Sequence, residues 1–242
     1  MLVLAISLMV VSHPIAFSKS NYRIIDSSLA ATGASDNEAV NSEKAELLGL
    51  YDKLALEAKG LTHMAFESAI KGFIHLKEAG KMRNQNILTI ADFTLSSAKK
   101  RLFIIDMDNQ KVLFNTYVAH GQKTGAEFAK DFSNRPESLQ SSPGFYITSS
   151  TYNGKNGYSM HLMGQEAGIN DKAYDRAIVM HGAPYVSESF IRARGYLGRS
   201  WGCPAVSQEL TMPIIETIKN GTCLFIFSGD VAYLNKSKIL NS

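Results

Sequence analysis

The chain has 242 residues, of which 45% are hydrophobic and 19% charged, and its net charge at pH 7 is +3. These values are ordinary for a globular protein, and the length suits one domain with an extension. The charge is mild, and no cluster of Lys and Arg interleaved with aromatic residues is present, which argues against nucleic-acid binding.

The N-terminus carries a short apolar segment. The run Met1–Val11 is too short to cross a bilayer, which needs about 20 residues. It fits the hydrophobic region of a signal peptide, with Ala16 and Ser18 as small residues before a cleavage point. No Lys or Arg precedes the run, so a core helix is the alternative. We expect residues 1–18 to be a signal peptide, the protein to be exported, and no stable membrane span.

A linker and two helices are expected next. Residues 19–42 are rich in Ser, Ala, Asn and Asp without a clear period, which is typical of a linker. The segment 43–84 has helical apolar spacing in two stretches, one with Ser42 as its N-cap and one over residues 62–78. These helices either brace the following domain or form a small partner-binding unit.

From residue 85 the pattern changes to short strands, predicted at 86–92, 101–107, 111–119, 144–151, 158–163, 176–180 and 222–227. One helix is predicted at 208–220. Many short strands without βαβ alternation predict a mostly β fold, a β-rich α+β domain with a barrel- or sandwich-like sheet over residues 85–232. A C-terminal tail, 233–242, follows. The polar segment 121–142 is either a substrate lid or a plain surface excursion.

Two residues carry the chemistry most directly. Cys203 follows a glycine in Ser200-Trp201-Gly202-Cys203-Pro204, and His181 stands at the end of an apolar run, directly before Gly182. A thiol becomes a good nucleophile when a neighbouring imidazole takes its proton. The alternative is that Cys203 is a small buried hydrophobe and His181 a core histidine. The glycines beside both residues favour a cysteine nucleophile with a histidine base.

The second cysteine, Cys223, lies in an apolar run that reads as a buried strand. A disulfide with Cys203 would abolish the nucleophile, so we expect Cys223 to be a free core residue. No CxxC and no His/Cys cluster at zinc spacing occurs in the sequence, and neither a metal nor a cofactor is expected.

These motifs also resemble a known family, the L,D-transpeptidase (YkuD-like) catalytic domain, in the branch with a Ser-x-Gly-Cys-Pro motif. The resemblance runs from about residue 88 to about 230, and its upstream matches are Ala119-His120-Gly121, Phe132-Ser133-Asn134, Ser142-Pro143-Gly144-Phe145-Tyr146 and Gly168-Ile169-Asn170-Asp171. Two positions depart from the commoner form of the family. Trp201 stands where that form has His, and Ala205 where it has Asn or Arg.

The resemblance implies a substrate, a reaction and the same β-rich fold. A cysteine thiolate attacks the L-centre carbonyl of diaminopimelate in a peptidoglycan stem tetrapeptide, releases D-alanine and passes the acyl group to an amine. Acylation of the cysteine by carbapenem β-lactams is also implied. The enzyme is then expected in the periplasm or outside the cell, associated with the wall.

The resemblance also suggests how the site is built. The carbonyl of Gly182 would orient His181, and the backbone N–H groups of Gly202 and Cys203 would hold the oxyanion. Ser200 would either fix the cysteine turn or be a plain turn residue. Arg199 would either pair with a substrate carboxylate, the interpretation we favour, or face solvent. Trp201 and Tyr185 are expected to contact substrate.

Two alternatives stay open. In the first, water replaces the amine and the protein is an L,D-carboxypeptidase. In the second, the protein is a non-catalytic wall-binding protein in which Trp201 stacks on ligand and Cys203 is vestigial.

Overall fold

The computed structural model describes the backbone of residues 29–242 and the side chains of residues 41–242. The expected signal peptide, 1–18, lies outside the described residues. Residues 41–242 form one compact unit. None of the helices in the described part is long and apolar enough to cross a membrane.

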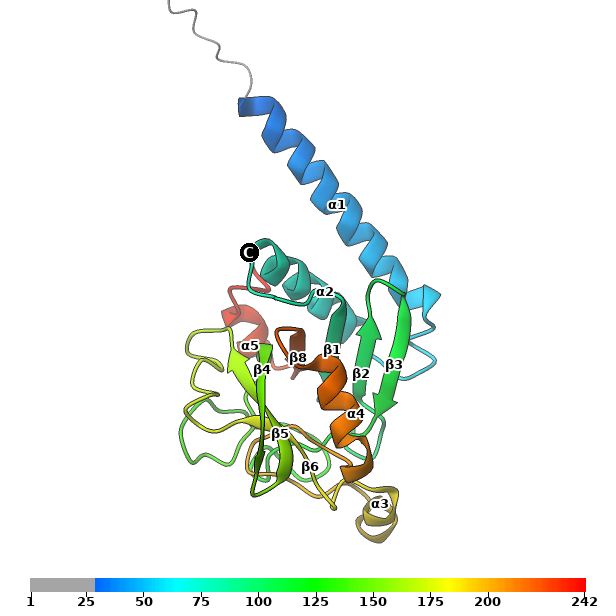
Figure 1. The fold of residues 1–242 in the computed structure, drawn as a ribbon, viewed down its shortest axis with the longest axis vertical. Coiled ribbons are helices and arrows are strands. Elements are labelled where there is room, and N and C mark those ends of the chain that lie inside the picture. Colours follow the sequence, from blue (N-terminus) through cyan, green and yellow to red (C-terminus); the bar gives the residue numbers. More distant parts are fainter. Residues whose placement is uncertain (1–28) are drawn as a thin grey trace, which may run out of the picture. The chain divides into compact units, whose positions relative to one another are not determined.

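Helices and strands alternate irregularly along the chain (Figure 1). The helices are α1 (Leu29–Lys53), α2 (His63–Glu78), α3 (Glu188–Arg194), α4 (Gln208–Ile218) and α5 (Val231–Lys236). The strands are β1 (Ile87–Asp92), β2 (Leu102–Asp106), β3 (Lys111–Thr116), β4 (Gly144–Gly154), β5 (Gly157–Gly164), β6 (Val179–Gly182), β7 (Ala205–Val206) and β8 (Cys223–Phe227).

The first helix differs from the sequence expectation. It begins at Leu29, so residues 29–42 are helical where a linker was predicted, and Ser42 is not an N-cap. The Ala, Glu and Leu residues of this stretch favour helix even where no apolar period marks it. The second helix is confirmed, with Thr62 as its N-cap.

The eight strands form a single mixed sheet in the order β3-β2-β1-β8-β4-β5-β6-β7. One end is drawn toward the other, because Ala119, just past edge strand β3, makes an antiparallel bridge with Ala205 in the opposite edge strand β7. The sheet therefore curls into a nearly closed, barrel-like form, and the predicted mostly β fold is confirmed.

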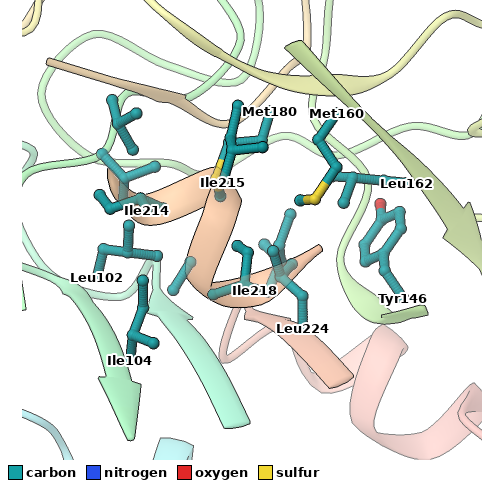
Figure 2. Close-up of a cluster of buried hydrophobic side chains, with 14 of the residues drawn as sticks. Leu102, Ile104, Tyr146, Met160, Leu162, Met180, Ile214, Ile215, Ile218 and Leu224 are labelled. Carbon is teal, nitrogen blue, oxygen red and sulfur yellow. The ribbon is translucent and has the colours of Figure 1, made fainter. Parts of the chain in front are cut away.

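Helix α4 fills the concave side of this sheet (Figure 2). Its buried residues Ile214, Ile215 and Ile218 belong to one hydrophobic cluster with buried side chains from seven of the eight strands. Those labelled in the figure are Leu102, Ile104, Tyr146, Met160, Leu162, Met180 and Leu224. Burying these side chains is the main favourable contribution to folding, at about 25 cal/mol per Å² of apolar surface.

The opposite face of the central strands is covered as well. Helix α2 contacts β1 and β8, so the N-terminal helical segment braces the sheet. At this contact Gly72 of α2 lies directly against the ring of Phe145, which stacks on Phe225 with ring centroids 4.1 Å apart. Because both faces are covered, β1, β2 and β8 are buried along their whole lengths. Cys223 is accordingly a buried free cysteine, as expected.

The C-terminal residues are part of the packed unit. Tyr233, Ile239 and Leu240 are buried, although residues 233–242 were expected to be a tail. The buried carboxyl of Glu166 accepts hydrogen bonds from the hydroxyls of Tyr233 and Ser237. The sequence does not reveal this because the apolar residues are spaced irregularly among polar ones.

Most of the remaining predicted elements are confirmed within a few residues. The strand expected at 176–180 instead begins at Val179, because Ile178 N–H donates to the carbonyl of Ala173 in a preceding turn. The elements not predicted are two short helices, α3 and α5, and the two-residue strand β7.

The contact between Gly72 and Phe145 gives a stability test. A methyl group at position 72 overlaps the Phe145 ring, so Gly72→Ala should lower the free energy of unfolding by at least about 1 kcal/mol. Gly49 of α1 has open space around it, and Gly49→Ala should raise that free energy by up to about 1 kcal/mol. Urea denaturation of both variants makes the comparison. Equal effects of the two substitutions would contradict this packing.

Candidate active site

A tight turn presents Cys203. The Ser200 hydroxyl accepts a hydrogen bond from Gly202 N–H (3.1 Å) and donates one to the carbonyl of Cys203 (2.6 Å). Gly202 has φ +123°, and a Cβ there would lie 2.8 Å from the carbonyl oxygen of Gln140, so the position requires glycine. Ser200 therefore fixes the turn, which is one of the two roles considered for it.

This bonding corrects one expectation. The N–H of Gly202 was expected to hold an oxyanion, but it is already bonded to the Ser200 hydroxyl. Within residues 41–242 the N–H of Cys203 makes no hydrogen bond. Of the two N–H groups predicted to hold an oxyanion, it is therefore the one that is free to donate. Sequence patterns do not show which N–H groups form hydrogen bonds within the turn itself.

The Cys203 thiol is half-buried between two backbone groups. Its Sγ lies 3.5 Å from the nitrogen of Val179 and 3.7 Å from the carbonyl oxygen of Ala177. Burial raises the pKa of this thiol above its usual 9.0, and the Val179 N–H and the positive charge of Arg176 oppose that rise. At neutral pH the thiol is therefore protonated in the resting protein.

His181 is supplied by strand β6 and is almost fully buried. Its Nδ1 lies 2.9 Å from the carbonyl oxygen of Gly182, the group expected to orient it. A carbonyl can only accept, so Nδ1 carries the proton and Nε2 keeps its lone pair. Burial lowers the pKa of His181 below 6.5, while the bond to Gly182 works against this shift. The imidazole is therefore neutral at pH 7.

Strand pairing brings the histidine to the cysteine turn. In the parallel pair of β6 and β7, His181 is the partner of Ala205, two residues after Cys203. His181 and Cys203 then line one cavity of about 390 Å³. The other residues around this cavity are Lys155, Asn156, Arg176, Ala177, Ile178, Tyr185, Arg199, Ser200 and Trp201.

The predicted site residues thus lie together. Six of them line the cavity, and Gly182 and Gly202 support it through the backbone. The Trp201 side chain is 71% exposed at the edge of the cavity. Burial, with a smaller contribution from Cys203, raises the pKa of Tyr185 to about 12, so its hydroxyl remains protonated and able to donate.

Arg176 is a site residue that the sequence reading missed. Its guanidinium donates to the carbonyl of Ser133 (2.8 Å), the hydroxyl of Ser142 (2.6 Å) and the carbonyl of Gln140 (2.7 Å). It therefore holds the long segment 121–142 while placing positive charge near the thiol. Its partners are 34 to 43 residues upstream and include backbone carbonyls, so no sequence motif marks them.

The segment 121–142, expected to be a lid or a surface excursion, packs against the cysteine turn. The Ser141 hydroxyl accepts from Gly121 N–H (3.0 Å) and donates to the carbonyl of Gly202 (3.0 Å). Gly121 also forms a parallel bridge with Ser200. The segment is thus a fixed wall behind the catalytic turn.

His120, the other histidine in the matching motifs, belongs to a buried polar network instead. Arg101 is fully buried, and its Nη2 lies 2.7 Å from Nδ1 of His120. On the other side of the imidazole ring, Nε2 of His120 lies 3.2 Å from the carbonyl oxygen of Gly125. Burial, followed by the charge of Arg101, lowers the pKa of His120 to about 3. This neutral histidine ties the start of segment 121–142 to the sheet.

A family-wide comparison decides where the chain belongs. The profile of the L,D-transpeptidase catalytic domain matches residues 57–227. The chain belongs to this family. The match covers α2, the whole sheet and the cavity that holds Cys203 and His181.

Solved structures of the family are similar at low identity. The L,D-transpeptidase from Mycobacterium smegmatis is 12% identical over 59% of this chain and 58% of that one, with a TM-score of 0.36. The helical cell shape determining protein Pgp2 from Campylobacter jejuni is 14% identical over 66% of this chain and 55% of its own length, with a TM-score of 0.41.

The L,D-transpeptidase LdtMt1, solved in complex with imipenem, is 11% identical over 59% of each chain, with a TM-score of 0.36. The chain thus spans less than two thirds of the length of these proteins. No curated protein matches it.

No group of three or more His, Cys, Asp or Glu side chains suited to a metal ion occurs in the part of the chain that the structure describes. The thiol, the neutral imidazole and the free Cys203 N–H supply a nucleophile, a base and a hydrogen-bond donor for developing negative charge.

The effect of the Arg176 charge on the pKa of the Cys203 thiol can be measured directly. Arg176→Gln removes the charge that favours the thiolate, so the pKa of Cys203 should move upward. The pH dependence of Cys203 alkylation by iodoacetamide, followed by peptide mass, measures this shift. Arg135→Gln, an exposed position on the same segment, is the control and should leave the pKa of Cys203 unchanged. An unchanged or lower pKa in Arg176→Gln would contradict this role.

Proposed function

We propose that the protein is an exported peptidoglycan L,D-transpeptidase that works through a cysteine thioester. The observation that carries the proposal is the shared cavity of Cys203 and His181, in which the Gly182 carbonyl fixes the imidazole with Nε2 free to accept a proton. Membership of the L,D-transpeptidase catalytic domain family supports the reaction class.

The reaction proceeds in two acyl transfers. His181 Nε2 accepts the thiol proton as Sγ attacks the L-centre carbonyl of diaminopimelate in a stem tetrapeptide. The C–N bond to D-alanine then breaks, the imidazolium returns the proton to the leaving amine, and a thioester remains. An acceptor amine attacks the thioester, His181 accepts a proton from that amine, and the thiol leaves protonated.

The electrostatics of the resting site favour a concerted first step. Burial raises the pKa of Cys203 and lowers that of His181, so both groups are neutral before substrate binds. A thiolate–imidazolium pair is thus not formed in advance, and proton transfer accompanies attack on the carbonyl. The N–H of Cys203 is the donor that we assign to the developing oxyanion.

Substrate binding and location are parts of the same proposal. Arg199, Trp201 and Tyr185 line the cavity and contact the stem peptide, and a carbapenem acylates the same thiol. The apolar run within residues 1–18 supports export to the periplasm or the cell exterior, where peptidoglycan lies.

An L,D-carboxypeptidase is the second candidate, since water can replace the amine in the second transfer. The exposed position of Trp201 beside the cavity also suits a non-catalytic wall-binding protein. The products formed from disaccharide tetrapeptide separate these functions. Cross-linked dimers indicate a transpeptidase, tripeptide a carboxypeptidase, and an absence of D-alanine release a binding protein.

Removal of the nucleophile should abolish the reaction. With Cys203→Ala, neither a carbapenem adduct nor D-alanine release is expected, and intact-mass spectrometry detects both. His181→Gln should lower the rate of acylation about 10²- to 10⁴-fold, the usual contribution of a general base. Cys223→Ala, which changes a buried cysteine of the sheet, is the control and should retain acylation. An adduct on Cys203→Ala would sink the assignment.

The pH dependence of acylation should report both groups. His181 must be deprotonated to act as base, so activity is lost as pH falls through its folded pKa, which lies below 6.5. The pKa of Cys203 lies above 9.0, so thiolate formation contributes only on the alkaline side. The rate of acylation by disaccharide tetrapeptide from pH 4 to pH 10 tests this. An acid limb centred above 6.5 would contradict the assignment.

A further inference from the structure

A second cavity, of about 290 Å³, adjoins the catalytic cavity and has no role in the mechanism above. The two cavities share Tyr185 and Arg199 as a common wall. The rest of the second cavity is lined by Gln122, Phe190, Arg194, Tyr196, Leu197 and Gly198. A substrate seated at Cys203 can therefore extend across this wall into the second cavity.

The charge in this cavity is positive and uncompensated. Two of its eight lining residues, Arg194 and Arg199, carry guanidinium groups, and none carries a carboxylate. Among residues 41–242 neither guanidinium forms a salt bridge, whereas the neighbouring Arg192 lies 3.8 Å from Glu188. Two like charges around one cavity repel each other, and an anion between them removes that repulsion.

Both guanidinium groups lie against other parts of the chain. Arg194 lies 6.0 Å from the ring centroid of Phe190, and Arg199 lies 6.0 Å from that of Tyr196. Arg199 also donates to the carbonyl of Gly125 at 3.2 Å. Aromatic rings limit the hydration and motion of a guanidinium, whose planar fork matches a carboxylate with two parallel hydrogen bonds.

The wall between the cavities is firmly built. Leu197 is fully buried in a small cluster of apolar side chains, against which Tyr185 packs. Gly198 N–H donates to the carbonyl of Tyr185 at 3.0 Å, and any side chain at position 198 would overlap the Tyr185 ring. Arg199 is thus carried by a segment whose backbone is held on both sides of Gly198, while Arg194 ends helix α3. A fixed backbone lowers the entropy cost of binding a ligand.

We infer that this second cavity is a carboxylate subsite, in which Arg194 and Arg199 bind a carboxylate of the stem peptide while its carbonyl lies at Cys203. The inference rests on the proposed function. Two carboxylates flank the attacked carbonyl, that of the C-terminal D-alanine and that of the second centre of diaminopimelate. Their shared chemistry is what the arginines recognise, and an experiment distinguishes the source.

The test uses three disaccharide tetrapeptides: the free acid, the amide of the second diaminopimelate centre, and the C-terminal D-alaninamide. The rate and KM of Cys203 acylation are measured by intact mass for the unaltered protein, Arg194→Gln and Arg192→Gln. Arg192 is a matched control, because it lies two residues away on the same helix and does not line the cavity. Alkylation by iodoacetamide reports whether Cys203 is intact in each variant.

We expect the KM of the unaltered protein to be about tenfold lower for the free acid than for one of the two amides. A tenfold difference corresponds to the loss of one charge-assisted hydrogen bond. The amide that loses affinity identifies the carboxylate. Arg194→Gln should abolish this preference by raising the KM for the free acid to that for the amide, and Arg192→Gln should retain the preference. Arg194→Lys keeps the positive charge but lacks the planar guanidinium, so this variant should restore part of the preference for the free acid.

Two results would overturn the inference alone. In the first, the unaltered protein reacts equally well with the acid and both amides. In the second, Arg194→Gln keeps the same preference as Arg192→Gln. If the unaltered protein forms no acyl-enzyme with any of the three peptides while iodoacetamide still alkylates Cys203, the proposed function fails and the subsite fails with it.

Discussion

The parallel pairing of β6 with β7 joins two parts of the chain that lie more than twenty residues apart. It sets His181 opposite Ala205 and thereby beside the turn that carries Cys203. The same short strand β7 also bridges to Ala119, which draws the two ends of the sheet together. Closure of the sheet and assembly of the cavity therefore both depend on strand β7. A change that opens this edge of the sheet would also separate the thiol from the imidazole.

Packing makes this arrangement rigid. The isoleucines of α4 fill the inside of the curled sheet, and α2 covers the outside of its central strands. Segment 121–142 is held in place by polar contacts instead. Arg176 secures segment 121–142 beside the cysteine turn, and the buried Arg101–His120 network secures its beginning. Apolar burial thus places the strands, and hydrogen bonds to backbone carbonyls place the loops between them.

The sequence alone predicted much of this molecule, for identifiable physical reasons. Strands buried on both faces appear as unbroken apolar runs, and Gly202 beside Cys203 marks a turn with a positive φ that favours glycine. Gly182 beside His181 lies in strand β6, where a Cβ would be 2.2 Å from the Thr211 hydroxyl. Short elements such as β7 have too few residues to show a period. The contacts of Arg176 are with residues 34 to 43 positions upstream and have no local signature. The bond of Gly202 N–H to Ser200 likewise emerges only when the turn is folded.

The neutral resting state of Cys203 and His181 bears on how the thiol reacts with oxidants. Peroxides and disulfides react with the thiolate form of cysteine and hardly with the thiol. A half-buried, protonated Cys203 is thus less reactive toward these oxidants than a thiolate would be. Cys223, the other cysteine, is fully buried in the central strand β8 and offers no accessible partner for a disulfide. The partial burial that raises the pKa of Cys203 therefore also lowers the reactivity of this thiol toward oxidants.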